Sequence, residues 1–124
     1  MALVFVYGTL KCGHYNHSVL GDSQFMGEYK TDERWGLVNL GAFPGLVAGP
    51  LSVKGEVYDV DEATLKRIDR LEGVGYGLYM RHKIPIYNLS GELQDESVWT
   101  YIYGSVGDII KNYDTLMSEW VAHV

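Results

Sequence analysis

The sequence predicts an α+β fold built on a mixed β-sheet or barrel. Segments with the short apolar runs or alternating pattern of strands lie on both sides of one clear helical segment. Ten tyrosines and fifteen glycines among 124 residues favour strands joined by tight turns. The regular alternation of strand and helix that a doubly wound parallel sheet requires is missing from this order.

Length, charge and cysteine content restrict the class of protein. We expect residues 1–124 to form one domain, and 47% hydrophobic with 21% charged residues is an ordinary globular composition. A net charge of −6 argues against nucleic acids and anionic membranes as partners. Cys12 is the single cysteine, so an internal disulfide is excluded. Because no apolar run reaches the roughly 20 residues that span a bilayer, we expect a soluble, cytoplasmic protein.

The first half of the chain reads mainly as strands. A short helix is expected within Gly13–Gly21, and the prolines and glycines of Ala42–Pro50 predict a loop. The expected strands are Leu3–Tyr7, Phe25–Thr31, Trp35–Leu40 and Ser52–Val60.

One helix is expected at Glu62–Glu72. Asp61 is a suitable N-cap, and Gly73 suits a left-handed residue that ends the helix. Apolar residues recur at every third position: Leu65, Ile68 and Leu71.

The last part of the chain predicts two strands, Leu78–Tyr87 and Val98–Tyr103, with an exposed turn at Asp95 and Glu96 between them. Helical spacing from Ile109 to Val121 predicts a closing helix whose Met117 and Trp120 pack against the sheet.

The first candidate site is the end of the first strand. Gly8 lets the backbone turn or lets another group approach closely, so several N–H groups of Tyr7–Leu10 can point the same way. Such a cluster of amides attracts a carboxylate or a phosphate, and Thr9 could add a hydroxyl. The alternative is an ordinary tight turn. A phosphate loop is disfavoured, since neither of the glycine-rich nucleotide-binding patterns follows the strand.

The second candidate is Glu72, at the end of the predicted helix and before a glycine-rich loop with Tyr76 and Tyr79. The helix dipole disfavours a negative charge at this end, and burial among aromatic residues would add to the effect. Both effects would raise the pKa of the carboxyl and make it a better general base. The alternative is a solvated glutamate near Arg70.

Together these stretches resemble the γ-glutamylcyclotransferase family, also called AIG2-like. The family motifs are a strand ending in Y-G-T-L, a helix ending in L-D-x-F/L-E and a Y-x-R strand start. They correspond to Tyr7-Gly8-Thr9-Leu10, Ile68-Asp69-Arg70-Leu71-Glu72 and Tyr79-Met80-Arg81. The opening MALVFVYGTLK and the segment GEVYDVDEATLKRID are similar to the γ-glutamylamine cyclotransferase branch.

The resemblance implies a small barrel-like sheet flanked by helices and a reaction that needs no metal or cofactor. The α-amine of a γ-glutamyl substrate attacks its own γ-carbonyl, which releases 5-oxoproline and a free amine. Glu72 would be the general acid and base, and the amides of Tyr7, Gly8, Thr9 and Leu10 would hold the glutamyl group. Tyr79 and Tyr103 would line the pocket or orient Glu72, although both could equally be core tyrosines.

Several alternatives stay open at this stage. The scaffold could be a non-catalytic module that binds a small carboxylate, or an enzyme that removes a γ-glutamyl group from one biosynthetic intermediate. The loops Gly73–Leu78 and Ala42–Pro50 would shape the amine side of the pocket. Arg81 could hold a carboxylate but fits an exposed strand position better. His14, His17 and Cys12 are interpreted as bystanders rather than as metal ligands or a nucleophile.

Overall fold

The computed structural model describes residues 2–14, 16–103 and 116–121. One α-helix, α1 (Glu62–Leu71), and two 3₁₀ turns, η1 (His17–Leu20) and η2 (Val74–Tyr76), accompany the sheet. The strands are β1 (Ala2–Val6), β2 (Gln24–Lys30), β3 (Trp35–Asn39), β4 (Pro44–Ala48), β5 (Lys54–Val60), β6 (Tyr79–Tyr87) and β7 (Leu93–Tyr103).

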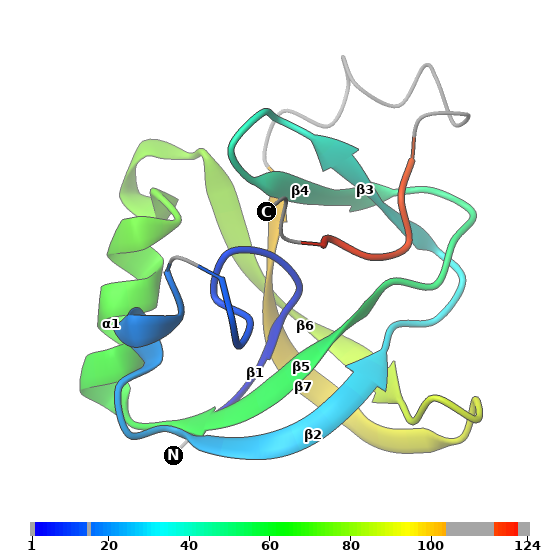
Figure 1. Ribbon diagram of the computed structural model, residues 1–124, viewed down its shortest axis with the longest axis horizontal. Helices are drawn as coiled ribbons and strands as arrows, with labels where there is room; N and C mark the ends of the chain where they lie inside the picture. Colours follow the sequence, from blue (N-terminus) through cyan, green and yellow to red (C-terminus); the bar gives the residue numbers. More distant parts are fainter. Residues whose placement is uncertain (1, 15, 104–115, 122–124) are drawn as a thin grey trace.

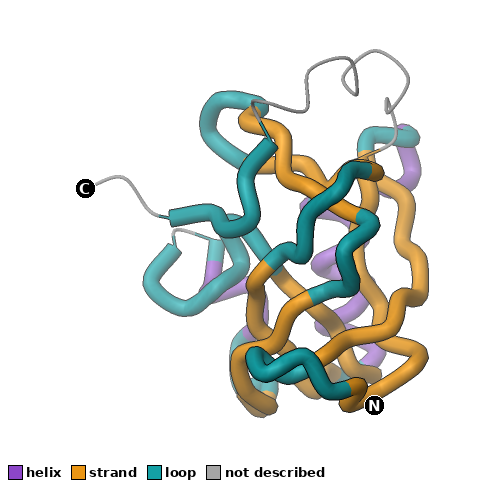
Figure 2. Tube along the Cα trace, turned by 90° about the vertical axis from the view of Figure 1, so that its right-hand side faces the viewer, coloured by secondary structure: helices purple, strands orange, loops and turns teal. Residues whose placement is uncertain are grey.

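The strands form one mixed sheet that closes into a barrel. The order is β1-β5-β2-β6-β7-β4-β3, and a parallel pairing of β1 with β7 at Val4 and Trp99 closes the ring. The β3–β4 hairpin lies outside this ring and joins β7 through Leu46 and Ile102 (Figure 1). The helices lie together on one side of the strands (Figure 2). The predicted α+β fold with a mixed, barrel-like sheet is therefore confirmed.

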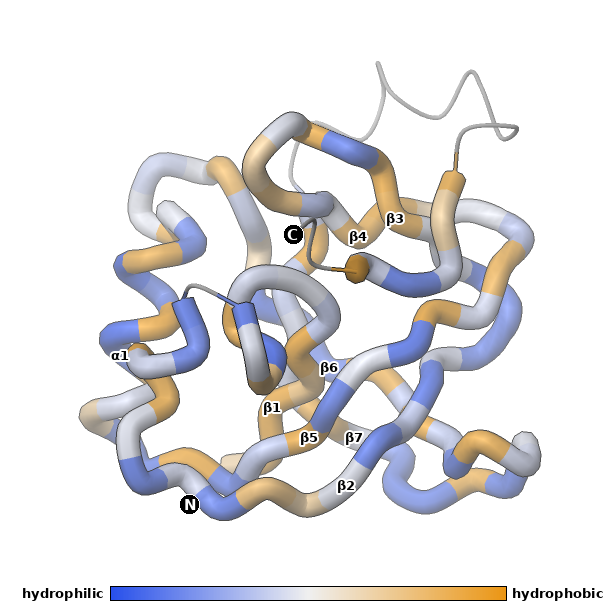
Figure 3. Tube along the Cα trace, in the orientation of Figure 1, coloured by the Kyte–Doolittle hydropathy of each residue, from blue (hydrophilic) through white to orange (hydrophobic). Residues whose placement is uncertain are grey.

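Strand β1 is buried on both faces because it lies between two apolar clusters. Phe5, with Tyr7 just beyond the strand, belongs to the cluster inside the barrel, where Val57, Ile84, Val98 and Trp120 also lie. Val4 and Val6 face the second cluster, which includes Ile68 of α1. Successive side chains of a strand point to opposite faces, so a continuous apolar run suits this position. The apolar course of β1 through the centre is visible in Figure 3.

The predicted helix is confirmed, together with the residues expected to begin and end it. The Asp61 carboxylate accepts a hydrogen bond from the N–H of Thr64 at 2.7 Å, as an N-cap does. Ile68 is fully buried against the barrel. The helix ends at Leu71, Glu72 is its C-cap, and Gly73 has φ 65°, a left-handed conformation that glycine adopts without a steric penalty.

Two local predictions are corrected. The segment Ala42–Pro50 contains strand β4, whose pairing with β3 and β7 overrides its loop-like composition. Its Pro44 is the first residue of the strand, where proline is tolerated. Asp95 and Glu96 lie in β7 at an irregularity of the β6–β7 pairing, and the turn is at 88–92 instead. The Glu96 side chain is exposed and the Asp95 side chain is partly exposed, as polar residues usually are.

The predicted closing helix is wrong over 116–121, and its first part lies outside the described residues. Here Met117 pairs with Leu37 of β3, and the N–H of Lys54 donates to Ser118 O. Met117 and Trp120 do pack against the barrel core, as expected. The predicted helix in Gly13–Gly21 is the short η1 turn. No helix among the described residues has the length and apolarity needed to cross a membrane.

Candidate active site

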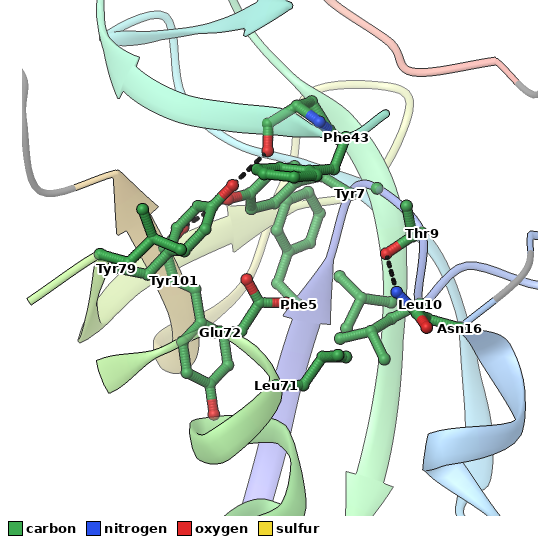
Figure 4. Close-up of a pocket in the computed structure, with 14 residues that line it drawn as sticks. Phe5, Tyr7, Thr9, Leu10, Asn16, Phe43, Leu71, Glu72, Tyr79 and Tyr101 are labelled. Carbon is green, nitrogen blue, oxygen red and sulfur yellow. Dashed lines mark hydrogen bonds between the residues drawn. The ribbon is translucent and has the colours of Figure 1, made fainter. Parts of the chain in front are cut away.

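A pocket of about 360 Å³ opens where β1 ends and α1 ends. Its floor consists of β1 residues and the following turn, and its walls come from α1, β4, β6 and β7 (Figure 4). The lining residues are Phe5, Val6, Tyr7, Gly8, Thr9, Leu10, Asn16, Phe43, Pro44, Leu71, Glu72, Leu78, Tyr79 and Tyr101. The structure thus brings both predicted constellations, the strand end and Glu72, to one cavity.

The turn after β1 uses its carbonyl groups for structure. The carbonyl of Gly8 accepts from the N–H of Lys11 at 3.0 Å, and that of Thr9 accepts from the N–H of Asn16 at 2.9 Å. Nδ1 of His17 is 2.9 Å from the carbonyl oxygen of Leu10. The Thr9 hydroxyl also accepts a hydrogen bond from the Asn16 side chain at 2.9 Å. The carbonyls of Gly8, Thr9 and Leu10 are therefore engaged by other groups of the protein.

Glycine is required at position 8 because Pro44 lies against it. A Cβ at this position would be 2.8 Å from Cγ of Pro44 and 2.9 Å from Cδ. Contacts that short force the turn and the start of β4 apart.

We therefore expect Gly8→Ala to weaken binding of any ligand held by the turn. The expected loss is roughly tenfold in affinity, since displacing the amides costs about one charge-assisted hydrogen bond. Isothermal calorimetry with 5-oxoproline or glutamate checks this. Gly75→Ala is the control, because a Cβ there meets nothing within 4 Å. Unchanged affinity in Gly8→Ala would contradict the role given to this turn.

Glu72 carries the perturbed carboxyl of the pocket. The side chain is half-buried and points into the cavity between Phe5, Tyr79 and Tyr101 (Figure 4). Burial in these apolar surroundings raises the pKa of Glu72 to about 7. A carboxyl with this pKa exists in both protonation states near neutral pH, as a general acid and base requires.

Two tyrosines hold the walls of the pocket together. The hydroxyl of Tyr7 donates to the carbonyl of Tyr101 at 2.6 Å and accepts from the N–H of Leu46 at 3.2 Å. Burial first, and then the negative charge of Glu72, raise the pKa of Tyr7 well above its usual value, so it remains a neutral donor. The hydroxyl of Tyr79 donates to the carbonyl of Pro44 at 2.7 Å. These bonds fix β4 to β6 and β7 beside the turn.

Of the remaining predicted residues, some line the pocket and others lie outside its lining. Tyr79 lines the pocket, whereas Tyr103 lies behind it, with ring centroids 5.6 Å apart in an edge contact. Arg81 is not an exposed strand charge: its guanidinium is 3.4 Å from the Asp69 carboxylate and 4.5 Å from the centroid of the Trp99 ring.

Sequence reasoning did not name Tyr101 or Asn16 as site residues, and it placed Phe43 and Pro44 at the pocket only as part of the segment Ala42–Pro50. Tyr101 had a usable signal, since it lies two residues before Tyr103 on the same strand face.

Among the described residues, the histidines and the cysteine do not belong to any group of three or more side chains that could hold a metal ion. Cys12 is exposed, and its backbone N–H donates to the Glu56 carboxylate at 2.8 Å.

Comparison with known proteins identifies the family of this chain. The sequence model of the family described as gamma-glutamyl cyclotransferase, AIG2-like, matches residues 4–122. A relative from Vibrio cholerae, provisionally named a gamma-glutamylcyclotransferase, is 48% identical over 101 residues, 82% of this chain and 81% of its own. The gamma-glutamylcyclotransferase family protein YtfP of Escherichia coli is 35% identical over 118 residues, 95% of each chain.

Solved structures show the same fold. A mouse AIG2-like protein superposes with a TM-score of 0.73 at 32% identity, over 96% of this chain and 86% of that one. The solution structure of Escherichia coli YtfP gives a TM-score of 0.64 at 35% identity, over 94% and 92% of the two chains. The chain belongs to the γ-glutamyl cyclotransferase, AIG2-like family.

Proposed function

We propose that this protein is a γ-glutamylcyclotransferase that converts γ-glutamyl amines into 5-oxoproline and the free amine, with Glu72 as general acid and base. The observation that carries the proposal is the position of Glu72. A carboxyl with a pKa of about 7 points into the same pocket as the amide-rich turn at 7–10.

The chemistry needs one proton carrier. The substrate α-ammonium loses one proton to Glu72, and its nitrogen bonds to the γ-carbon. The bond from that carbon to the leaving nitrogen then breaks as Glu72 gives this proton to the leaving nitrogen. The new ring nitrogen gives up a second proton, which Glu72 accepts and passes to the free amine, so that the amine leaves as an ammonium ion. An α-amine has a pKa of about 8, so transfer to an ordinary glutamate at about 4.3 costs roughly 5 kcal/mol. At a pKa of about 7, the cost falls to roughly 1.4 kcal/mol.

The turn would hold the glutamyl group in the folded conformation that cyclises. The N–H groups of Tyr7, Gly8, Thr9 and Leu10 are suited to the α-carboxylate and to the oxyanion that forms at the γ-carbonyl. Because the attack is intramolecular, fixing the reactive conformation supplies a large part of the rate enhancement.

The residues at the mouth of the pocket favour a leaving amine with an aliphatic chain. Leu71 and Leu78 line the pocket and remain 40% and 41% exposed, and Phe43 adds a half-buried ring. These residues come from the end of α1 and from the two loops expected to shape the amine side. Methylene groups of a leaving amine would bury apolar surface here, at about 0.8 kcal/mol for each one.

Incubation with γ-glutamyl-ε-lysine, γ-glutamyl-n-butylamine, γ-glutamylglycine and γ-glutamylalanine tests the proposal. We expect equal amounts of 5-oxoproline and free amine, with kcat/KM at least roughly tenfold higher for the two alkyl amines. Release from the amino acid conjugates alone would contradict the amine specificity. Binding of 5-oxoproline without any turnover would instead identify a non-catalytic carboxylate-binding module.

The raised pKa of Glu72 predicts the pH dependence of the reaction. The base must be deprotonated, so turnover should rise as pH increases through about 7 rather than through the usual glutamate range. The assignment is checked by ¹³C NMR titration of the Glu72 carboxyl in the free protein, which avoids overlap with the substrate amine. A midpoint near 4.5, the ordinary value, would contradict the burial effect.

A further inference from the structure

Tyr101 contacts both halves of the candidate site. Its backbone carbonyl accepts from the hydroxyl of Tyr7, which begins the amide-rich turn, at 2.6 Å. Its own hydroxyl donates to the Asp69 carboxylate on α1, also at 2.6 Å. Its ring is buried and lines the pocket between these two contacts (Figure 4). One residue of β7 therefore joins the turn to the helix that carries Glu72.

Asp69 is one helical turn before Glu72, so the two side chains lie on neighbouring positions of the same helix face. The second carboxylate oxygen of Asp69 is 3.4 Å from the Arg81 guanidinium, which lies over the Trp99 ring. The last turn of α1 is thus attached to β6 through Arg81 and to β7 through Tyr101. These polar attachments matter because helix ends fray and the following loop contains Gly73, Gly75 and Gly77.

We propose that Tyr101 is a positioning residue: its hydrogen bond to Asp69 fixes the end of α1 and so sets where the Glu72 carboxyl lies relative to the 7–10 turn. The kinetic part of this inference rests on the proposed function. Proton transfer requires the base within about 2.6–3.2 Å of the amine. A displacement of about 1 Å can cost roughly 100-fold in rate, so a small shift of the helix end is sufficient.

The protonation states suit this bond. Burial first, and then the hydrogen bond to Asp69, raise the pKa of Tyr101, so the phenol stays protonated and donates. Because this hydroxyl is bound to Asp69, Tyr101 acts on Glu72 through the helix rather than by transferring a proton to substrate. Asp69 and Glu72 belong to the same sequence motif. In the structure, Tyr101 of the barrel connects that motif to the turn at 7–10.

Tyr101→Phe tests the inference while keeping the ring in the pocket. We expect kcat for the γ-glutamyl alkyl amines to fall roughly 10- to 100-fold with KM changed less than about threefold. Tyr58→Phe is the matched control, since it removes a tyrosine–carboxylate bond of 2.9 Å, to Glu56, elsewhere in the barrel. It should lose a similar amount of stability and keep its kinetics.

A substrate-free readout separates this inference from the proposed function. In Tyr101→Phe, the NMR-measured pKa of Glu72 should move down from about 7, because a displaced carboxyl gains solvent, whereas Tyr58→Phe should leave it unchanged. This measurement decides the inference even if no substrate of the panel is turned over. A Glu72 pKa and a kcat that both match the wild type in Tyr101→Phe would overturn it.

Asp69→Ala removes the acceptor from the helix side and keeps the test valid if Tyr101→Phe folds poorly. The Asp69 side chain is 24% exposed, so its truncation leaves the barrel core intact. The same downward shift of the Glu72 pKa is expected. The effects of the two substitutions should be non-additive in the double variant, because both remove the Tyr101–Asp69 bond; Asp69→Ala also removes the contact with Arg81 and should have the larger single effect. Additive effects would show that each acts separately and would overturn the coupling.

Discussion

Replacing Glu72 with glutamine is expected to abolish release of 5-oxoproline while the protein stays folded. The amide keeps the size and hydrogen-bonding shape of the side chain but can neither accept the α-amine proton nor return it to the leaving nitrogen. General acid–base groups contribute roughly 10²- to 10⁴-fold to enzymatic rates. In the proposed mechanism one carboxyl serves both proton transfers, so we expect the loss of kcat at the upper end of this range.

The matched control is Glu62→Gln on the same helix. The Glu62 side chain is 85% exposed in the first turn of α1 and makes a surface contact of 3.7 Å with Lys66. Its substitution should leave turnover within about twofold of wild type, since exposed ion pairs contribute little. Turnover in Glu72→Gln at the level of this control would disprove the mechanism.

Stability measurements show whether lost activity in Glu72→Gln reflects chemistry or unfolding. The pKa of Glu72 is raised in the folded protein, so its ionisation opposes folding, and stability is lost as pH rises from about 4.5 through about 7. Glutamine cannot ionise and avoids this loss. The variant should therefore be at least as stable as wild type at pH 5 and more stable at pH 8, by urea denaturation. A variant less stable at pH 8 would contradict this.

The largest expected effect on stability is that of Phe5→Ala. Phe5 is 0% exposed in the barrel core and also forms part of the pocket floor. Its ring lies against Gly55 of β5, where an added Cβ would be 2.6 Å from the ring. Truncation leaves a cavity inside the barrel, where the paired strands cannot move together freely to fill it. We expect the free energy of unfolding to fall by about 3–5 kcal/mol.

Phe25→Ala provides the comparison for this prediction. The Phe25 side chain is 51% exposed on β2 and contacts the Tyr58 ring at 5.4 Å between centroids. Its truncation should cost no more than about 1 kcal/mol, the range of one aromatic contact. Chemical denaturation of both variants gives the difference. Equal losses would show that the packing around Phe5 does not carry the stability assigned to it.

The sequence predicted the local features that depend on neighbouring residues. The cap at Asp61, the end of α1 and the left-handed Gly73 were all correct, because capping and glycine geometry act over a few residues. The buried strand before Tyr7 and the partial burial of Glu72 were likewise expected from apolar neighbours. The family motifs then named the residues of the strand end and the helix end.

Features that depend on distant partners were not predictable. Strand β4 forms only because β3 and β7 supply its hydrogen bonds, which override the prolines and glycines of its segment. Residues 116–121 have helical spacing but pair at Met117 with Leu37, a partner far away in the sequence. Arg81 was expected at the surface and instead bonds to Asp69 on a different element. In each case a tertiary contact outweighs a weak local preference.

The sequence by itself determined the strand that ends in the amide-rich turn, the helix that ends at Glu72 and the family to which both motifs belong. Only the tertiary structure decided that these ends share one pocket, and that Tyr101 rather than Tyr103 lines it. The physical reason is barrel closure: the pairing of β1 with β7 at Val4 and Trp99 places the end of β1 beside Tyr101. That pairing joins the first and the last of the described strands, which lie far apart in the chain, and leaves no trace in local sequence.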